Sequence, residues 1–420
     1  MQPLDTATKP IYKRKNFSVF RYLGPGILVT VGFIDPGNWA ANLAAGSEFG
    51  YSLLWMVTLS TIMLIMLQHN SAHLGIATGY CLSENSARHL KPFISRGILL
   101  TAMGAAISTA LAEILGGAIA INMLFGVPIK VAMFGILGIV ILTLFFNTYK
   151  RIEKLIILFV AIIALSFFYE TTLFSIDWEQ VGISTITPSF PEGSLLIIVS
   201  VLGAVVMPHN LFLHSEIIQS RKWYLRSAKL KKKLLRYEFL DTLISMLLGW
   251  IINSVIIILA AEVFFKNNVL VTELSQAADL LTPILGGYSG VAFAIALLFC
   301  GVASSITAGM AGGTIFSGLF QKEYDETSKT TKAGVLSTLI IATLIILFID
   351  NPLKGLIYSQ MILSIQLPFT IFLQVYLTSS KKVMGEYANT KINNVLLISC
   401  GLFVSVLNIL LLISIFKGGL

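Results

Sequence analysis

The sequence Gly32-Phe33-Ile34-Asp35-Pro36-Gly37-Asn38 stands in the middle of a long apolar segment, residues 21–46. Proline lacks a backbone N–H and clashes with the preceding helical turn, and glycine places few restrictions on the backbone. We therefore predict that this helix unwinds near Pro36. A second apolar segment, residues 194–215, contains Gly203-Ala204-Val205-Val206-Met207-Pro208-His209, and Pro208 predicts a matching break there.

The composition around these segments indicates an integral membrane protein. Of the 420 residues, 56% are hydrophobic and only 12% are charged, whereas soluble proteins average about 25% charged residues. A helix needs roughly 20 mainly apolar residues to cross a bilayer. We assign eleven spans, at residues 21–46, 52–69, 97–125, 131–148, 154–171, 194–215, 238–263, 289–318, 333–350, 355–378 and 393–416.

The positions of the two breaks indicate an internal repeat within one transmembrane domain. Residues 21–171 would form a first repeat of five spans and residues 194–378 a second, with 393–416 as an eleventh span and 1–20 as a cytoplasmic segment. Because five is odd, the second repeat enters the membrane from the opposite side. Unwound backbone in a bilayer is tolerated only where protein buries it or where it lines a cavity. Paired breaks in inverted repeats therefore predict a substrate site near the midplane.

The basic residues sort to one side of this topology. With a cytoplasmic N-terminus, 25 of the 29 Lys and Arg residues lie inside, and the four outside are Lys130, Lys266, Lys354 and Lys417. Positive charge in short loops sets membrane orientation, so we predict a multi-pass cell-membrane protein with its N-terminus inside and its C-terminus outside. We attribute the net charge of +8 to these loops and not to a nucleic-acid partner, and we interpret the basic run 221–236 as a solvated cytoplasmic loop.

The residues at the breaks offer ligands for a cation. An unpaired carboxylate such as Asp35 costs several kcal/mol near the bilayer centre, and a bound cation or proton offsets that cost. Asn38 adds an amide oxygen and Met207 adds a thioether sulfur. The breaks also free the backbone carbonyls of Gly32 and Ala204 to face the same space. Oxygen ligands suit Mg²⁺ and Ca²⁺, whereas a thioether favours softer metals, so this set predicts a filter for Mn²⁺, Fe²⁺ or a similar ion.

These residues also carry a resemblance to a known family. Asp35-Pro36-Gly37-Asn38 together with Met207-Pro208-His209 resembles the signature pair of the Nramp family of divalent metal transporters. The resemblance covers nearly the whole chain, and it continues in Leu23-Gly24-Pro25-Gly26, in Asn210-Leu211-Phe212-Leu213-His214-Ser215, in Glu113 before Ile114-Leu115-Gly116, in Ser359-Gln360 and in Gln366-Leu367-Pro368-Phe369.

The resemblance implies an all-α fold of the leucine-transporter type, with about eleven transmembrane helices in a 5+5 inverted repeat and with helices 1 and 6 broken. It implies alternating-access import of Mn²⁺ or Fe²⁺ coupled to protons. The metal would be the transported substrate, with H⁺ as the coupling ion and no resident cofactor. The metal ligands that it implies are Asp35, Asn38, Met207, Ala204, Gly32 and, in some states, Gln360. The proton-path residues that it implies are Glu113, His209 and Asp35.

Departures from the family pattern cluster on the proton path. Ala110 stands where the family usually has an acid one turn before Glu113, and residues 328–332 offer Ser and Lys where the family has arginines. Residues 302–305 read Val-Ala-Ser-Ser where the family has Gln-Ser-Ser-Thr. We therefore predict an intact metal site and a proton path that is altered, shortened or lost.

Several other polar residues of the spans need an interpretation. We interpret His69 and His73, which lie four residues apart with no third ligand in view, as anchors at the membrane interface. Asp241 and Asn253 would either support the broken helices or line a vestibule for ions. Three hydroxyl groups of the eighth span are interpreted as helix-packing groups, with a polar lining as the alternative: Ser304, Ser305 and Thr307.

Other functions are compatible with parts of this pattern. A transporter of the same fold for an organic substrate would need a helix N-terminus shaped for a carboxylate, and a Mg²⁺-accepting relative would favour a small or hydroxyl residue in place of Met207. An uncoupled carrier is a further alternative. A sensor or scaffold would need a long soluble domain, but the longest loops have only about 25 residues. We expect a monomer whose partners are the metal ion and the bilayer, and no enzyme, because no pair of nucleophile and base stands within the spans.

Overall fold

The computed structural model describes residues 35–146, 158, 172, 175–269, 271–274 and 288–417. Within these ranges the chain is helical and forms no β-strand. Its longer helices are α2 (Pro36–Phe49), α3 (Leu54–Thr78), α5 (Pro92–Phe125), α6 (Ile129–Phe146), α9 (Leu195–Val205), α10 (Pro208–Ser220), α11 (Ala228–Ala260), α13 (Ser289–Leu319), α14 (Lys329–Ile346), α15 (Pro352–Ser379) and α17 (Lys391–Phe416). The shorter ones are α4 (Leu82–His89), α8 (Trp178–Ile186), η1 (Trp223–Leu225), the π-helix η2 (Ala261–Phe265), α16 (Lys381–Met384) and η3 (Gly385–Tyr387).

Most of the predicted spans are confirmed as helices. Eight helical segments of the described chain are long and apolar enough to cross a membrane, and they correspond to the third, fourth and sixth to eleventh predicted spans. Helix α3 has the length of a span, but Gln68, His69 and Asn70 lower its mean hydropathy. The first predicted span is described only from Asp35 onward. The fifth, 154–171, lies outside the described residues apart from residue 158.

The interpretation of the basic run 221–236 as a loop is wrong in part. Helix α11 begins at Ala228, so the second half of the run is helical. The physical reason is an apolar stripe within the run, because Leu234 is buried in a small cluster with Ala72 and Trp223. Lys and Leu are also good helix formers. The helix can therefore continue beyond the membrane with its basic side chains in water.

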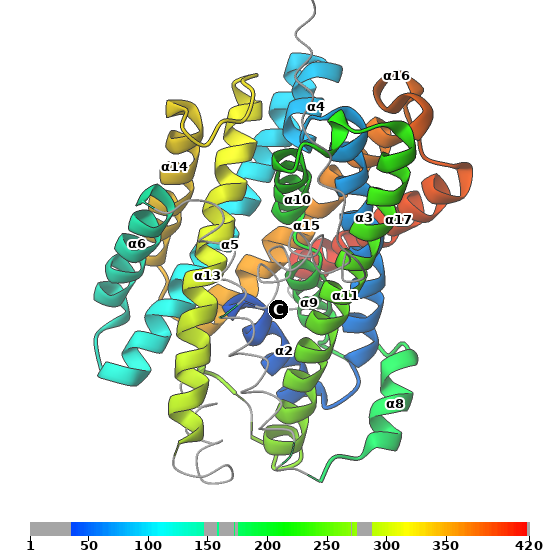
Figure 1. Cartoon of the computed structure of the whole chain (residues 1–420). Coiled ribbons are helices and arrows are strands. Elements are labelled where there is room, and N and C mark those ends of the chain that lie inside the picture. The colour runs from blue at the N-terminus through cyan, green and yellow to red at the C-terminus, as the bar shows by residue number, and fades with distance from the viewer. Residues whose placement is uncertain are drawn as a thin grey trace, which may run out of the picture.

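The centre of the molecule is built around α2 and the α9–α10 pair (Figure 1). Helix α2 packs against α9, α11 and α15, while α5 and α13 pack along each other at one side, with α6 and α14 outside them. Small residues let these helices approach closely, as is common in membranes. A Cβ atom added to Gly203 would stand only 2.0 Å from the backbone oxygen of Gln360. This contact holds α9 tightly against the middle of α15.

The sixth span is broken, as Pro208 predicts. Helix α9 ends at Val205, α10 begins at Pro208, and Met207 between them has an extended backbone with φ −72° and ψ 116°. In an unbroken helix the N–H of residue 208 would bond to the carbonyl of Ala204, but proline has no N–H. The break therefore leaves that carbonyl available at the middle of the span.

Candidate metal centre

Asp35 caps the helix that begins the described part of the first span. Pro36 is the first residue of α2, and Asp35 Oδ1 accepts a hydrogen bond of 2.7 Å from the backbone N–H of Asn38. Negative charge at a helix N-terminus is stabilised by the helix dipole. Asp35 is nevertheless fully buried, and no described residue donates a hydrogen bond to its second oxygen, Oδ2. That oxygen is a ready ligand for a cation.

Asn38 joins the start of α2 to the break in the sixth span. Its side-chain Nδ2 donates a hydrogen bond of 2.8 Å to the backbone oxygen of Ala204, the carbonyl that Pro208 leaves without its helical partner. The freed carbonyl of Ala204 therefore faces the start of α2, and Asn38 occupies one side of it. A carbonyl oxygen has two lone pairs, so this bond leaves Ala204 able to accept a second contact.

Met207 lies in the unwound segment itself and is fully buried. Its sulfur is 3.6 Å from Nδ2 of Asn210, which comes one turn later in α10. Because a thioether is only a weak acceptor, this contact leaves Met207 free to turn toward a soft cation. The predicted ligand Gly32 lies outside the described residues.

Gln360 reaches the same place from α15. A Cβ atom added to Gly37 would stand 1.8 Å from Gln360 Nε2 and 3.1 Å from Asp35 Oδ1. The amide of Gln360 therefore lies over the first turn of α2 beside Asp35, and only glycine at position 37 permits this approach. Gln360 Nε2 donates to the hydroxyl of Ser359, whereas Gln360 Oε1 accepts no hydrogen bond from the described residues.

The predicted proton-path residues lie next to this centre. A Cβ atom added to Gly116 would stand 2.0 Å from Pro36, so α5 contacts the start of α2 and carries Glu113 to a place where the charge of Asp35 reaches it. Glu113 is fully buried. His209 Nδ1 lies 3.1 Å from the hydroxyl of Thr109, one turn before Glu113 on the same face of α5. The structure thus brings Asp35, Glu113 and His209 to one region.

Other polar residues of the spans take specific places. Ser304 of α13 neighbours the Glu113 carboxyl, so at this position a hydroxyl faces the region of the proton-path residues. Asn253 accepts a hydrogen bond of 3.0 Å from Asn42, which ties α11 to α2 and agrees with the support role. The sequence interpretation missed Thr109 and Asn42. Their positions one helical turn from Glu113 and Asn38 are the signal that could have found them.

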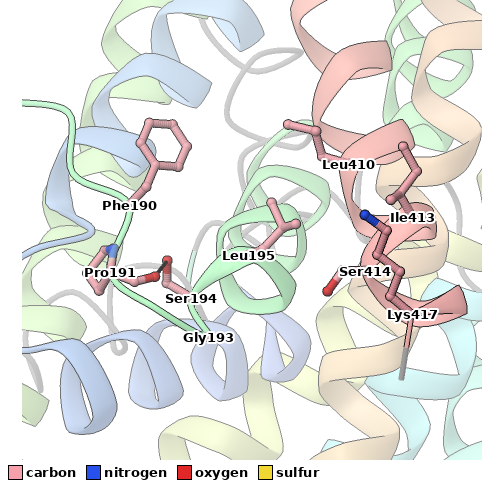
Figure 2. Close-up of a pocket in the computed structure, with 9 residues that line it drawn as sticks. All are labelled: Phe190, Pro191, Gly193, Ser194, Leu195, Leu410, Ile413, Ser414 and Lys417. Carbon is pink, nitrogen blue, oxygen red and sulfur yellow. Dashed lines mark hydrogen bonds between the residues drawn. The ribbon is translucent and has the colours of Figure 1, made fainter. Parts of the chain in front are cut away.

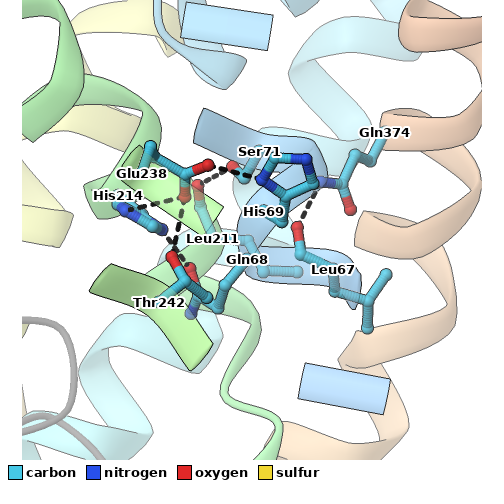
Figure 3. A network of polar contacts seen from close by, with 9 residues as sticks. All are labelled: Leu67, Gln68, His69, Ser71, Leu211, His214, Glu238, Thr242 and Gln374. Carbon is cyan, nitrogen blue, oxygen red and sulfur yellow. Dashed lines mark hydrogen bonds and ion pairs between the residues drawn. The ribbon is translucent and has the colours of Figure 1, made fainter. Parts of the chain in front are cut away.

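The interpretation of His69 as an interfacial anchor missed a partner in the protein. His69 Nδ1 lies 2.5 Å from Oε2 of the buried Glu238, which belongs to α11 (Figure 3). His73 stacks on His69 with ring centroids 6.2 Å apart. The partner was missed because Glu238 is 169 residues away in the sequence. Among the residues that the structure describes, no group of three or more His, Cys, Asp or Glu side chains is arranged to hold a metal, so this cluster is not a second metal centre.

A surface pocket lies apart from the breaks. It has a volume of about 450 Å³ and lies between the segment before α9 and the end of α17 (Figure 2). Its lining is mainly apolar, with Lys417 at one edge. None of the predicted ligands lines it, so it does not belong to the candidate metal centre.

The break between α9 and α10, with the capped start of α2 beside it in a bundle of apolar helices, defines the class of this protein, a multi-spanning membrane transporter of the leucine-transporter type. The chain matches the family model described as natural resistance-associated macrophage protein-like (Nramp) over residues 26–414. This match covers most of the sequence, and the chain therefore belongs to the Nramp family.

Similar proteins agree with this assignment. The chain is 38% identical over 401 residues to the divalent metal cation transporter MntH of Caldanaerobacter subterraneus, covering 95% of this chain and 94% of the relative. It is 37% identical over 407 residues to MntH of Brucella suis, covering 94% and 89%. A solved structure of the Eremococcus coleocola manganese transporter superposes with a TM-score of 0.82 at 26% identity, covering 97% of this chain and 90% of that one. The nucleobase-cation-symport-1 family transporter Mhp1 has a TM-score of 0.65 at 14% identity, covering 92% and 89%, and shares the fold.

Proposed function

We propose that this protein imports a divalent transition-metal ion, Mn²⁺ or Fe²⁺, by alternating access. The observation that carries the proposal is the bond between Asn38 and Ala204, which brings the capped carboxylate of Asp35 and the unwound segment at Met207 together at the centre of the bundle. A buried carboxylate oxygen without a donor needs a cation or a proton. The relatives named as divalent metal cation transporters support a metal as that cation.

The proposed ligands come from three helices. Asp35 and Asn38 are contributed by the start of α2, Met207 and the carbonyl of Ala204 by the α9–α10 break, and Gln360 by α15. Gly32 would add a backbone carbonyl from the preceding segment. In alternating access, movement of the broken helices would expose these ligands to one side of the membrane and then to the other.

The geometry argues against an organic substrate with a carboxylate. Such a substrate would need the free N–H groups at the N-terminus of a broken helix. In this protein Asp35 already caps the N-terminus of α2 and would repel a second anion. Met207 argues against a Mg²⁺ carrier, because Mg²⁺ gains little from a thioether.

Proton coupling belongs to the same proposal. Glu113 and His209 would carry protons near Asp35, and the hydroxyl of Thr109 beside His209 lies close to the position where the family acid is replaced by Ala110. Ligand carboxylates must be deprotonated to bind a metal. Metal affinity should therefore fall as the pH falls.

The proposed setting is the cell membrane, with the N-terminus inside, the C-terminus outside and a monomer as the working unit. The excess of basic residues on one side of the predicted topology supports this orientation. The structure supports the separation of the two sides, because α4 and α16 lie at one end of the bundle and α8 lies at the other (Figure 1).

The test is Mn²⁺ uptake into proteoliposomes that contain a pH-sensitive dye and carry an imposed membrane potential. We expect Mn²⁺ entry together with internal acidification. Entry without acidification would leave metal transport standing and exclude coupling. No Mn²⁺ or Fe²⁺ entry, with protein shown to be folded and inserted, would refute the proposal. Vesicles carrying Asp35→Asn serve as the control for leakage.

A further inference from the structure

A second group of titratable side chains lies apart from the metal centre, where α3, α10 and α11 meet (Figure 3). At its middle stands Glu238, whose side chain is only 1% exposed. Its Oε2 lies 2.5 Å from Nδ1 of His69, and its Oε1 accepts a hydrogen bond of 2.7 Å from Thr242. On the other side, Nε2 of His214 stands 3.9 Å from Oε1. We call His69, Glu238 and His214 the histidine–glutamate chain.

The charge of this chain depends on protons. Among the described residues, the only ion-pair partners of Glu238 are the two histidines, and neither carries a fixed charge. A buried carboxylate without a cation is costly. The pair of Glu238 and His69 is neutral overall in two states. Either Glu238 is protonated and His69 is a neutral imidazole, or Glu238 is ionised and His69 is an imidazolium. The pair carries a buried negative charge when that proton leaves.

The buried end of the chain has a defined tautomer. Gln68 Oε1 lies 2.9 Å from Nδ1 of His214, and an oxygen of this kind can only accept, so Nδ1 carries the hydrogen. Neutral His214 therefore presents the lone pair of Nε2 toward Glu238. No described residue bonds to that Nε2 at hydrogen-bond distance, although the residue is fully buried. His214 lies on α10, seven residues after Met207.

The other end of the histidine–glutamate chain, at His69, reaches the protein surface. The side chain of His69 is 31% exposed and lines a surface pocket of about 410 Å³ together with Leu235, Arg236, Phe239 and Leu240. This pocket lies toward the end of α3, which the predicted topology places on the cytoplasmic side. The histidine–glutamate chain thus connects α10, the second half of a broken helix, to the surface of the protein.

The remaining titratable groups around the histidine–glutamate chain come from α3, α11 and η3. On α3, His73 stacks on His69 and meets the ring of Tyr387 edge-on. On α11, Arg236 lines the pocket, Asp241 is buried one turn after Glu238, and Lys231 lies over the ring of Tyr387. Helix α15 contributes the neutral Gln374, which donates to the backbone oxygen of Leu67.

We propose that the histidine–glutamate chain is a proton-release route from α10 to the cytoplasmic pocket, separate from the pair Glu113 and His209. In the first step, Nε2–H of a protonated His214 passes its proton to Oε1 of Glu238, which requires a small side-chain rotation to shorten the 3.9 Å gap. Glu238 in its neutral form then gives a proton from its carboxyl to Nδ1 of His69. The imidazolium of His69 releases its Nε2 proton to water in the pocket and is left with a hydrogen on Nδ1. Exchange of that hydrogen for one on Nε2 restores the starting tautomer, in which Nδ1 accepts, and each residue returns to its starting charge.

The route rests on the proposed function in one respect, because proton-coupled transport is the source of the protons that reach α10. The test therefore uses two measurements on the full-length protein. The variants are His69→Gln and Glu238→Gln, which keep hydrogen-bonding capacity and remove titration. The matched control is His73→Gln, because His73 stacks on His69 without a hydrogen bond to Glu238. His69 is partly exposed, so its substitution should preserve folding even if the buried Glu238→Gln does not.

The first measurement is Mn²⁺ uptake with internal acidification in proteoliposomes. We expect His69→Gln and Glu238→Gln to lose most of the acidification per Mn²⁺ while Mn²⁺ binding stays close to wild type, and His73→Gln to match wild type in both. Wild-type ratios in both variants would overturn the route. Mn²⁺ entry without acidification in the wild type would also overturn it and leave metal transport standing.

The second measurement needs no transport. Infrared difference spectra between about pH 5 and about pH 8, the range in which histidine titrates, should show an imidazole band that is lost in His69→Gln and shifts in Glu238→Gln, because His69 contacts Glu238. Absence of such a band would overturn the route. If the band is present but the protein transports no Mn²⁺, the proton site is supported and the proposed metal transport is rejected. Failure of the route and failure of metal transport can therefore be told apart.

Discussion

At the scale of single residues, Asp35 caps a helix and is also a proposed metal ligand. Its carboxylate caps α2 through the N–H of Asn38, and its second oxygen is buried and accepts no hydrogen bond from the described residues. A cap at a helix N-terminus needs an acceptor, which Asp and Asn both supply. A metal site needs the negative charge, which only Asp supplies. The two roles can therefore be separated by substitution.

We predict that Asp35→Asn keeps the fold and loses the metal. The amide still caps α2, so thermal stability should stay near wild type. Mn²⁺ affinity measured by calorimetry should fall by more than about 100-fold, because even outer-shell changes at metal sites cost about 10- to 100-fold. Asp35→Ala should lose the metal too and also about 1 kcal/mol of stability from the missing cap. Mn²⁺ flux retained by either variant would remove Asp35 from the site.

The proposed site assigns the choice of ion to the thioether of Met207. We predict that Met207→Ala weakens transport of Mn²⁺ and Cd²⁺ and relaxes the exclusion of Ca²⁺ and Mg²⁺, because the remaining ligands are oxygen atoms that suit hard cations. The measurement is uptake of each ion from competing mixtures into proteoliposomes. Ala204, which contributes only its backbone oxygen, offers the control Ala204→Ser. Selectivity that does not change in Met207→Ala would refute the thioether filter.

At the scale of helices, close packing holds the breaks in place. Gly203 sits against the backbone of α15, and Gly116 sits against Pro36 at the start of α2. Backbone atoms cannot move aside as a flexible side chain can, so these contacts set the spacing of α9, α15, α5 and α2. The spacing of these helices therefore determines where the proposed ligands lie.

We predict that Gly203→Ala destabilises the protein by about 1–3 kcal/mol, the usual cost of overpacking, and lowers Mn²⁺ affinity by moving α9 away from α15. The added Cβ would stand 2.0 Å from the oxygen of Gln360. Thermal unfolding in detergent and Mn²⁺ titration measure the two effects. Gly104→Ala is the control, because no atom lies within 4 Å of a Cβ added there. Equal stability of the two variants would contradict the argument.

The sequence predicted the break in the sixth span, which the structure confirms, but not every contact across it. Pro208 and Pro36 predict the breaks because a missing N–H is a local property of the chain. The bond from Asn38 to Ala204 spans 166 residues, and the contact of His69 with Glu238 spans 169. Such pairs depend on how helices pack, which periodicity does not report. The start of α11 at Ala228 was missed for a related reason, because its apolar stripe finds partners on α3 and α10.

At the scale of the whole molecule, the distribution of basic residues and the arrangement of the helices both distinguish two ends of the bundle. The basic segments predicted to lie inside include those around α4 and α16, which share one end of the bundle, while α8 lies at the other end (Figure 1). Transport direction depends on which end faces the cytoplasm. Positive charge in short loops predicts that it is the end with α4 and α16.

We predict that a cysteine placed near α8 reacts from outside the cell and one placed before α11 does not. Thr187, just after α8, and Ser227, just before α11, are both exposed, and the side chain of Ser227 makes no capping bond. Cys81 and Cys300 are buried, so replacing the half-buried Cys400 by serine gives a quiet background. A membrane-impermeant maleimide should label Thr187→Cys on intact cells and Ser227→Cys only after permeabilisation. The opposite pattern would invert the topology and turn the proposed importer into an exporter for the same set of ligands.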